Sequence, residues 1–143
     1  MPSDTQLKIM NAVHRGLLKL SGGRIGNTAF GMPSLELTTI GRKSGSPRKT
    51  MLTAPIVDGD TIVIVASRGG DDTHPAWFLN LRDNPNVEVS LQQGPTKPYT
   101  AHIATPEERT KLWPRVVAAY KGYSDYQKKT SREIPLVILT PRA

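Results

Sequence analysis

Short segments rich in Leu, Ile, Val and Thr, separated by turn residues, constrain the fold of this chain most strongly. β-Branched and aliphatic residues in runs of this length favour strands. The run 62–65 is apolar throughout, which is typical of a strand buried on both faces. Asp58-Gly59-Asp60 indicates a tight hairpin between two of the segments. We therefore predict mostly antiparallel strands at residues 35–40, 50–57, 61–67, 87–91, 98–104 and 136–139.

Three segments predict helices around these strands. Residues 5–20 carry Leu and Met at helical spacing with Lys and Arg opposite, so they form a basic amphipathic helix that either covers the core or touches an anionic membrane. Pro75 suits the first turn of a short helix at 74–81. Thr105, Pro106 and Glu108 form a capping-box signature for a helix that runs to about Ala119.

This order of elements predicts an α+β fold, a small barrel closed by helices. The length of 143 residues predicts a single domain, 1–143. Within it, residues 1–33 provide the N-terminal helix and a Gly-rich connection. Residues 34–143 provide the barrel with its inserted and C-terminal helices.

Composition narrows the chemistry. The chain has no cysteine, which excludes disulfides, thiolate catalysis and Cys-ligated metals. Its formal charge of +7, from 19 basic and 12 acidic residues, favours anionic partners. No nucleic-acid motif accompanies that charge, so we expect no nucleic-acid partner. No apolar run reaches the roughly 20 residues of a membrane helix, and we expect a cytoplasmic protein.

A basic loop follows the first predicted strand. The segment Gly41-Arg42-Lys43-Ser44-Gly45-Ser46-Pro47-Arg48 brings forked guanidinium donors, a point charge, hydroxyls and flexible backbone together. Such a loop can hold an anion, and we expect a phosphate. The alternative is a basic turn that only aids solubility.

Two further segments could meet the same ligand. Glycines after the third strand let a ligand approach the backbone, and the helix that follows offers free N–H groups to an anion. Trp77 supplies either a flat face for a planar ring or core packing. His74 could serve as an acid or base, although a cap or surface role is commoner. These segments comprise Ala66, Ser67, Arg68 and Gly69, and the helix residues Ala76, Trp77, Phe78, Leu79 and Asn80.

Three tyrosines lie close together in the sequence. Tyr120, Tyr123 and Tyr126 recur every three residues, so they share one face if the segment stays helical. They form either a face for a polar aromatic ligand or a capping cluster over the barrel end. The common nucleophile, zinc, Walker and dinucleotide motifs are absent from the sequence. An anion cradle with few nucleophiles suits chemistry that a bound cofactor performs.

The ordered motifs resemble those of the deazaflavin-dependent nitroreductase family, whose members use coenzyme F-420. The resemblance covers residues 35–141 and rests on several segments at matching spacing. These are residues 37–48, 65–70, 74–81, 84–89, 105–109, 113–114 and 120–126.

The resemblance implies a split β-barrel related to flavin-mononucleotide-binding barrels, with 8-hydroxy-5-deazaflavin as the cofactor. The basic loop would grip the phosphate and polyglutamate tail, and substrate would lie near the three tyrosines. Tyr126 would hydrogen-bond or protonate it, with Tyr123 and Tyr120 beside it. Cofactor contacts are implied for Arg42, Lys43, Ser44, Gly45, Arg48, Lys49, Thr50, Ala66, Ser67, Arg68, Gly69, Ala76, Trp77, Phe78, Leu79 and Asn80.

The function implied is hydride transfer from reduced coenzyme F-420 to a quinone such as menaquinone, a nitroaromatic or a related acceptor. The alternative is a binding module for deazaflavin or flavin mononucleotide without turnover. The basic N-terminal helix and a lipid substrate together suggest that the protein contacts the inner face of an anionic cell membrane. Thr53 and Met51 stand where a well-known family member has a tyrosine and a proline, so the pocket wall differs from that of nitroimidazole reducers.

Overall fold

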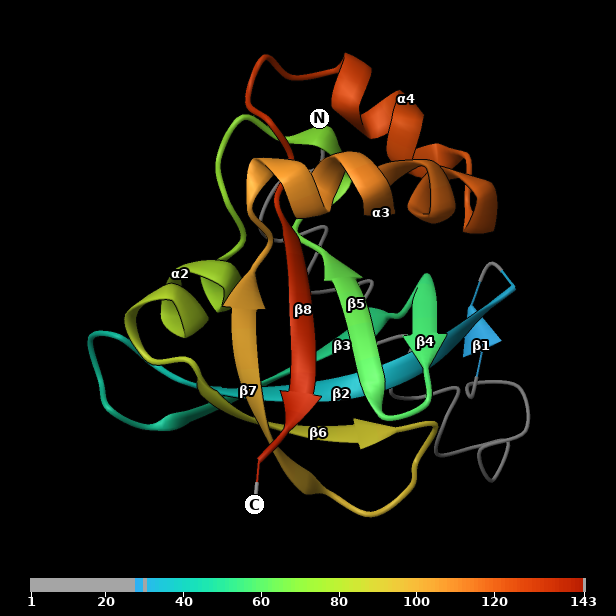
Figure 1. Ribbon diagram of the computed structural model, residues 1–143. Coiled ribbons are helices and arrows are strands. Elements are labelled where there is room, and N and C mark those ends of the chain that lie inside the picture. The colour runs from blue at the N-terminus through green and yellow to red at the C-terminus, as the bar shows by residue number, and fades with distance from the viewer. Residues whose placement is uncertain (1–27, 30, 143) are drawn as a thin grey trace.

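The computed structural model describes residues 28, 29 and 31–142. The helix expected at residues 5–20 lies outside the described residues. In the described part, an antiparallel sheet of eight strands forms the body of the molecule (Figure 1). Its strands are β1 (Thr28–Ala29), β2 (Met32–Ile40), β3 (Pro47–Thr53), β4 (Ile56–Asp58), β5 (Thr61–Val65), β6 (Asn86–Leu91), β7 (Lys97–Ile103) and β8 (Leu136–Pro141).

The sheet curls because a two-residue turn between β3 and β4 joins its two ends. Its order is β1-β2-β6-β7-β8-β5-β4, and β3 pairs with β2 as well. Only Ala54 and Pro55 separate β3, which pairs with β2 alone, from β4 at the other end. The Ala54 N–H donates to the Pro33 carbonyl at 2.8 Å, which holds the corner against the start of β2. The strands therefore wrap into the split barrel that the family resemblance implies.

Two apolar cores lie on opposite faces of the sheet. Ile62 and Ile64 of β5 belong to the core inside the barrel, whereas Val63 and Val65 belong to the core under the helices. Alternate residues of a strand point to opposite faces, so β5 is buried on both. Its side chains at 62–65 are at most 7% exposed. The prediction of a doubly buried strand is therefore confirmed.

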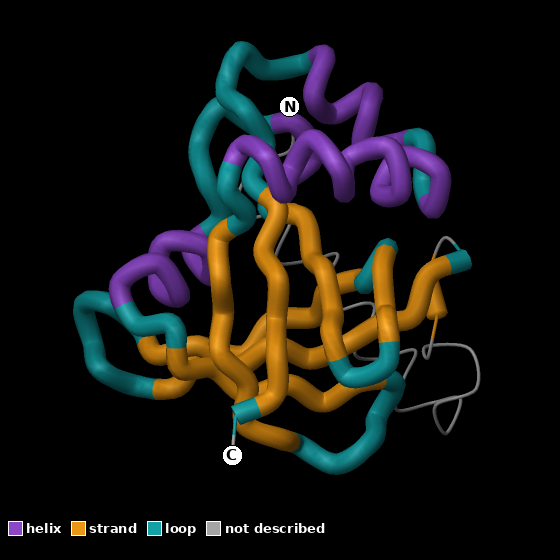
Figure 2. The backbone as a smooth tube through the Cα atoms, in the orientation of Figure 1, coloured by secondary structure: helices purple, strands orange, loops and turns teal. Residues whose placement is uncertain are grey.

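The helices lie at one end and one side of the barrel (Figure 2). The helices α3 (Pro106–Ala119) and α4 (Gly122–Lys128) cover one end, and α2 (Ala76–Asp83) lies beside β7 and the β2–β3 connection (Figure 1). A short 3-10 turn, η1 (Arg68–Gly70), leads from β5 towards α2. Thr105 and Glu108 form the predicted capping box of α3, with bonds of 3.2 and 2.8 Å. No helix among the described residues is long and apolar enough to cross a bilayer.

Several predicted elements differ from the structure: β2 begins three residues before the predicted strand, and β5 ends two residues before its predicted end. The strand expected at 50–57 is two strands, because the chain turns at Ala54 and Pro55, and Pro has no N–H for a continuous ladder. The helix expected at 74–81 begins and ends two residues later. Pro75 occupies its N-cap in an extended conformation rather than its first turn.

Candidate functional site

The basic loop between β2 and β3 is a tight, internally bonded turn. The Gly41 N–H donates to the Ser46 carbonyl and the Gly45 N–H to the Gly41 carbonyl, both at 2.8 Å. Gly45 has φ of +71°, a conformation that favours glycine. A Cβ at Gly41 would lie 2.6 Å from the Ser44 hydroxyl oxygen, so the turn leaves no room for a side chain there unless Ser44 moves.

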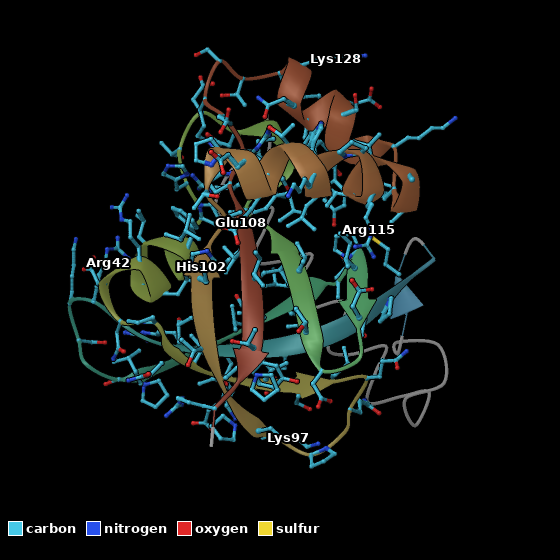
Figure 3. The ribbon with its side chains drawn as sticks, viewed as in Figure 1. Arg42, Lys97, His102, Glu108, Arg115 and Lys128 are labelled. Carbon is cyan, nitrogen blue, oxygen red and sulfur yellow. The ribbon has the colours of Figure 1, made fainter. Side chains whose placement is uncertain are left out.

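Four cationic side chains project from this loop and the start of β3. Arg42, Lys43, Arg48 and Lys49 are exposed, and Figure 3 shows Arg42 at the end of the hairpin beside α2. Arg48 donates to the Ser44 hydroxyl at 3.3 Å. The exposed Lys49 lies 3.9 Å from the half-buried Glu36, and a pair so open to solvent contributes little stability. The loop can therefore offer its positive charge to an anion in solution.

Asn80 connects α2 to the basic loop. Its Oδ1 accepts from the Arg42 backbone N–H at 3.2 Å and from the Arg42 guanidinium at 2.9 Å. Its Nδ2 donates to the buried Thr39 hydroxyl at 3.2 Å. Asn80 is only 4% exposed. The structure thus places Asn80 behind Arg42, where it orients the guanidinium.

The other predicted residues of α2 divide between surface and core. Ala76 is exposed, and Trp77 and Leu79 are half-buried against the barrel core. Phe78 is 3% exposed and belongs to that core.

Residues 66–74, between β5 and α2, form the second predicted segment. Ala66 and Ser67 are buried. Arg68 has φ of +48°, and its guanidinium bonds the Thr73 hydroxyl and lies 3.6 Å from an Asp71 carboxylate oxygen. Its side chain is 13% exposed. Arg68 therefore stabilises its own loop. Of its neighbours, Ala66 and Ser67 are buried and Gly69 has no side chain.

Arg132, which the sequence reasoning missed, binds this segment from the α4–β8 connection. Its guanidinium donates to the carbonyls of Ala66, Ser67 and Asp71 at 3.1, 2.9 and 3.0 Å. It also donates to His74 Nδ1 at 3.1 Å. Arg132 lies in a polar stretch without a motif, so no local sequence signal marks it.

His74 is held in one tautomer by this contact. Arginine can only donate, so Nδ1 must be the unprotonated acceptor and the ring proton resides on Nε2. Burial, followed by the charges of Arg132 and Arg82, lowers the pKa of His74 below its ordinary value of 6.5. The ring also packs against Phe78, with centroids 4.7 Å apart.

The three tyrosines gather as expected, although not through one continuous helix. Tyr120 ends α3 in an extended conformation, and Tyr123 and Tyr126 belong to α4. Their ring centroids lie 5.3 to 6.4 Å apart. The Tyr123 hydroxyl lies 3.0 Å from the Thr53 hydroxyl. Tyr123 and Tyr126 lie three residues apart on α4, whereas packing between α3 and α4 brings Tyr120 beside them.

Two of the three phenols, those of Tyr126 and Tyr123, are held in the neutral form by their surroundings. Burial raises the pKa of Tyr126 to about 12, and a hydrogen bond with Tyr120 adds to the effect. Burial also raises the pKa of Tyr123. Near neutral pH these groups can donate hydrogen bonds, but they release protons reluctantly.

Close packing at Gly70 joins the tyrosines to residues 66–74. A Cβ at Gly70 would lie 2.7 Å from the Tyr126 carbonyl oxygen, and Gly70 has φ of +85°. Contacts therefore run from the basic loop through Asn80 and α2 to residues 66–74, and from there to Tyr126. Among the described residues, no group of three His, Asp or Glu could hold a metal ion.

This arrangement fits an anionic, aromatic cofactor. The fixed turn with exposed Arg42 and Lys43 suits a phosphate or carboxylate tail. The half-buried Gly69 and Trp77 leave some exposed surface for a planar group, whereas Ala66 and Ser67 are buried.

Comparisons with known proteins agree with this chemistry. Residues 11–141 match the family model described as F420H(2)-dependent quinone reductase. A curated relative, an F420H(2)-dependent quinone reductase from Mycobacterium tuberculosis, is 42% identical over 95% of this chain and 90% of its own length.

Two solved structures are also similar. One, of an F420-H2 dependent reductase, is 41% identical, covers 75% of this chain and 93% of its own, and has a TM-score of 0.65. A protein of the pyridoxinephosphate oxidase family from Clostridium acetobutylicum shares only the fold, at 13% identity, a TM-score of 0.52 and coverage of 88% and 84%. The chain belongs to the F420H(2)-dependent quinone reductase family.

Proposed function

We propose that this protein is an oxidoreductase that passes a hydride from reduced coenzyme F-420 to a quinone or a related electrophilic acceptor. The observation that carries the proposal is the basic loop held by Asn80: a rigid turn that points arginine and lysine at solvent beside a helix. Family membership supports the same coenzyme and acceptor.

The residues would share the work as follows. Arg42, Lys43 and Arg48, with the Ser44 hydroxyl, would bind the phosphate and acidic tail of the coenzyme, and Gly45 would shape the turn that carries them. Lys49 and Thr50 would extend that surface along β3. The backbone of residues 66–69 and the side chains of Ala76, Trp77 and Leu79 would border the planar ring. Asn80 and Phe78 would support this surface from behind.

When bound in its reduced form, the coenzyme supplies a hydride and a proton, and a quinone that gains both becomes a quinol. The protein contributes binding, orientation and exclusion of water. Tyr126 and Tyr120 would donate a hydrogen bond to the acceptor oxygen as negative charge develops there. The raised pKa of Tyr126 favours this hydrogen-bonding role over full proton release.

A fluorescence titration with oxidised coenzyme F-420 tests the binding step. We expect micromolar or tighter binding, and Arg42→Ala with Lys43→Ala should weaken it by about 1–3 kcal/mol for each charged hydrogen bond lost. Arg115→Ala is the matched control, because Arg115 is also exposed but pairs with Asp58. Failure of the wild-type protein to bind would refute the proposal.

Turnover separates the enzyme from a binding module. Rapid mixing of the protein with reduced coenzyme F-420 and menaquinone should oxidise the coenzyme much faster than the uncatalysed reaction does. Binding without accelerated oxidation would favour the non-catalytic alternative. Nitroaromatics belong in the same acceptor screen, because Thr53 bonds Tyr123 at the position expected to shape the pocket.

We also propose peripheral contact with an anionic membrane. The charge of +7 and the lipid nature of menaquinone support it. The full chain should float with vesicles that contain anionic lipid and not with neutral ones. Equal flotation with both would refute charge-driven binding, and so would none with either.

A further inference from the structure

Two connections, residues 66–75 and 129–135, run side by side near the covered end of the barrel (Figure 2). The first carries the backbone proposed above to border the coenzyme. The second follows the tyrosine helix α4. They are joined by bonds that start mainly from one side chain, Arg132.

The guanidinium of Arg132 is almost fully used. Nε donates to the Asp71 carbonyl, Nη2 to the Ser67 carbonyl, and Nη1 to the Ala66 carbonyl and to His74 Nδ1. These four acceptors span both ends of residues 66–74. Only a planar fork of donors can reach all of them at once.

Arg132 is itself fixed in place. Its backbone N–H donates to the Thr130 hydroxyl at 3.2 Å, and its carbonyl accepts from Gln127 at 2.8 Å. The Thr130 hydroxyl in turn donates to Asp72 at 2.7 Å. The clamp thus rests on the end of α4 and has a second attachment to the same segment.

One of the four contacts depends on protonation. His74 can accept from Arg132 only while Nδ1 carries no proton. A protonated ring would place two cations 3.1 Å apart. His74 faces Arg132 from the α4–β8 connection and Arg82 from α2. The other charged groups near Arg132 belong to the clamped segment and are Asp71, Asp72 and Arg68.

We infer that Arg132 is a positioning residue that holds residues 66–74 in the conformation the coenzyme site requires, and that it does so fully only while His74 is neutral. The inference about coenzyme rests on the proposed function, whereas the inference about the clamp does not. Burial and the neighbouring cations keep His74 neutral near pH 7 by lowering its pKa. Acid should therefore loosen the segment and weaken coenzyme binding.

Hydrogen exchange of the protein without coenzyme tests the clamp directly. Arg132→Lys keeps the charge but loses the fork, so amides in residues 66–74 should lose protection by roughly tenfold. Arg142→Lys is the matched control: Arg142 also donates to two main-chain carbonyls, of Tyr99 and Val87, but at the other end of the barrel. Unchanged protection of residues 66–74 in Arg132→Lys, or an equal loss throughout the chain, would overturn the inference.

The pH dependence provides a second test that does not need an arginine variant. As pH falls from about 7.5 through the lowered pKa of His74, wild-type protection factors in residues 66–74 should fall, and the Kd for coenzyme F-420 should rise roughly tenfold. His74→Asn keeps an acceptor near the Nδ1 position and cannot titrate, so both quantities should become flat with pH. A flat wild-type profile would contradict the role of His74, as would an unchanged slope in His74→Asn.

The two proposals fail in different ways. If the wild-type protein binds no coenzyme at any pH, the proposed function fails, and the exchange measurements still decide the clamp. If coenzyme binds and turns over but Arg132→Lys has wild-type protection and affinity, the clamp fails and the function stands.

Discussion

At the scale of single residues, Asn80 shows how a buried side-chain amide orients an exposed guanidinium for binding. All three of its described side-chain bonds go to Arg42 and Thr39, so its side chain orients the cation, and Asn80 is only 4% exposed. The sequence placed Asn80 among the cofactor contacts. The structure shows it bonded to the protein itself, which makes it a support for Arg42.

Replacing Asn80 should therefore act through Arg42. Asn80→Ala removes the partner recorded for the buried Thr39 hydroxyl and should lower the free energy of unfolding by about 1–3 kcal/mol in urea. It should also weaken coenzyme F-420 binding. In a double-mutant cycle with Arg42→Ala, the losses in affinity should be clearly less than additive. Fully additive losses would show that Asn80 acts independently, and Asn86→Ala, at an exposed position, serves as the control.

Tyr126 leads to a prediction about alkaline stability. Its folded-state pKa of about 12 exceeds the ordinary value of 10.0 for a tyrosine. Above pH 10 the unfolded chain releases this proton before the folded chain does, so stability falls as pH rises from 10 towards 12. Tyr126→Phe should make the decrease in Tm between about pH 9 and pH 11.5 less steep. An unchanged decrease would mean that the Tyr126 phenol titrates normally. Tyr99 also has a raised pKa but lies outside this cluster, so Tyr99→Phe serves as the comparison.

At the scale of elements, the contact between η1 and α4 joins the two parts of the candidate site. Gly70 lies against the backbone at Tyr126, and Arg132 follows a few residues beyond α4. The loop that should border the coenzyme and the helix that should face the acceptor therefore move together. We therefore expect any displacement of η1 to shift the tyrosines as well.

Gly70→Ala tests this contact. The new Cβ would require a shift of backbone and would also occupy a left-handed conformation. Gly59→Ala has a similar φ of +61° but meets nothing within 4 Å, so it isolates the cost of the conformation. Gly70→Ala should destabilise the fold by about 1–3 kcal/mol more than Gly59→Ala, because overpacking adds to strain. Equal decreases in the free energy of unfolding in urea would mean that the Gly70–Tyr126 contact accommodates the new methyl group.

At the scale of the whole molecule, the net charge of +7 creates a field that favours an acidic ligand. Coenzyme F-420 binding should weaken several-fold as NaCl rises from about 50 to about 500 mM, because salt screens exposed charges. The slope should be smaller in Arg42→Ala with Lys43→Ala. An identical slope would place the phosphate and tail away from the basic loop, and Arg115→Ala is again the control.

Much of this architecture could be predicted because it follows local rules. Runs of β-branched residues indicated the strands, Asp58-Gly59-Asp60 the hairpin, and Thr105 with Glu108 the start of α3. The break at Ala54 and Pro55 was missed. Pro55 within the predicted strand is a local sign of this break, whereas the placement of β3 and β4 at the two ends of the sheet depends on closure of the sheet.

The amino-acid sequence by itself determined the strands, the basic loop and the family, because periodicity, charge and ordered motifs are properties of neighbouring residues. Only the tertiary structure decided which polar groups face each other. Asn80 lies 38 residues from Arg42, and Arg132 lies 58 residues from His74. Such pairs form only after the sheet has curled and the helices have packed on its end, and this is why the guanidinium of Arg132 could not be recognised as a clamp beforehand.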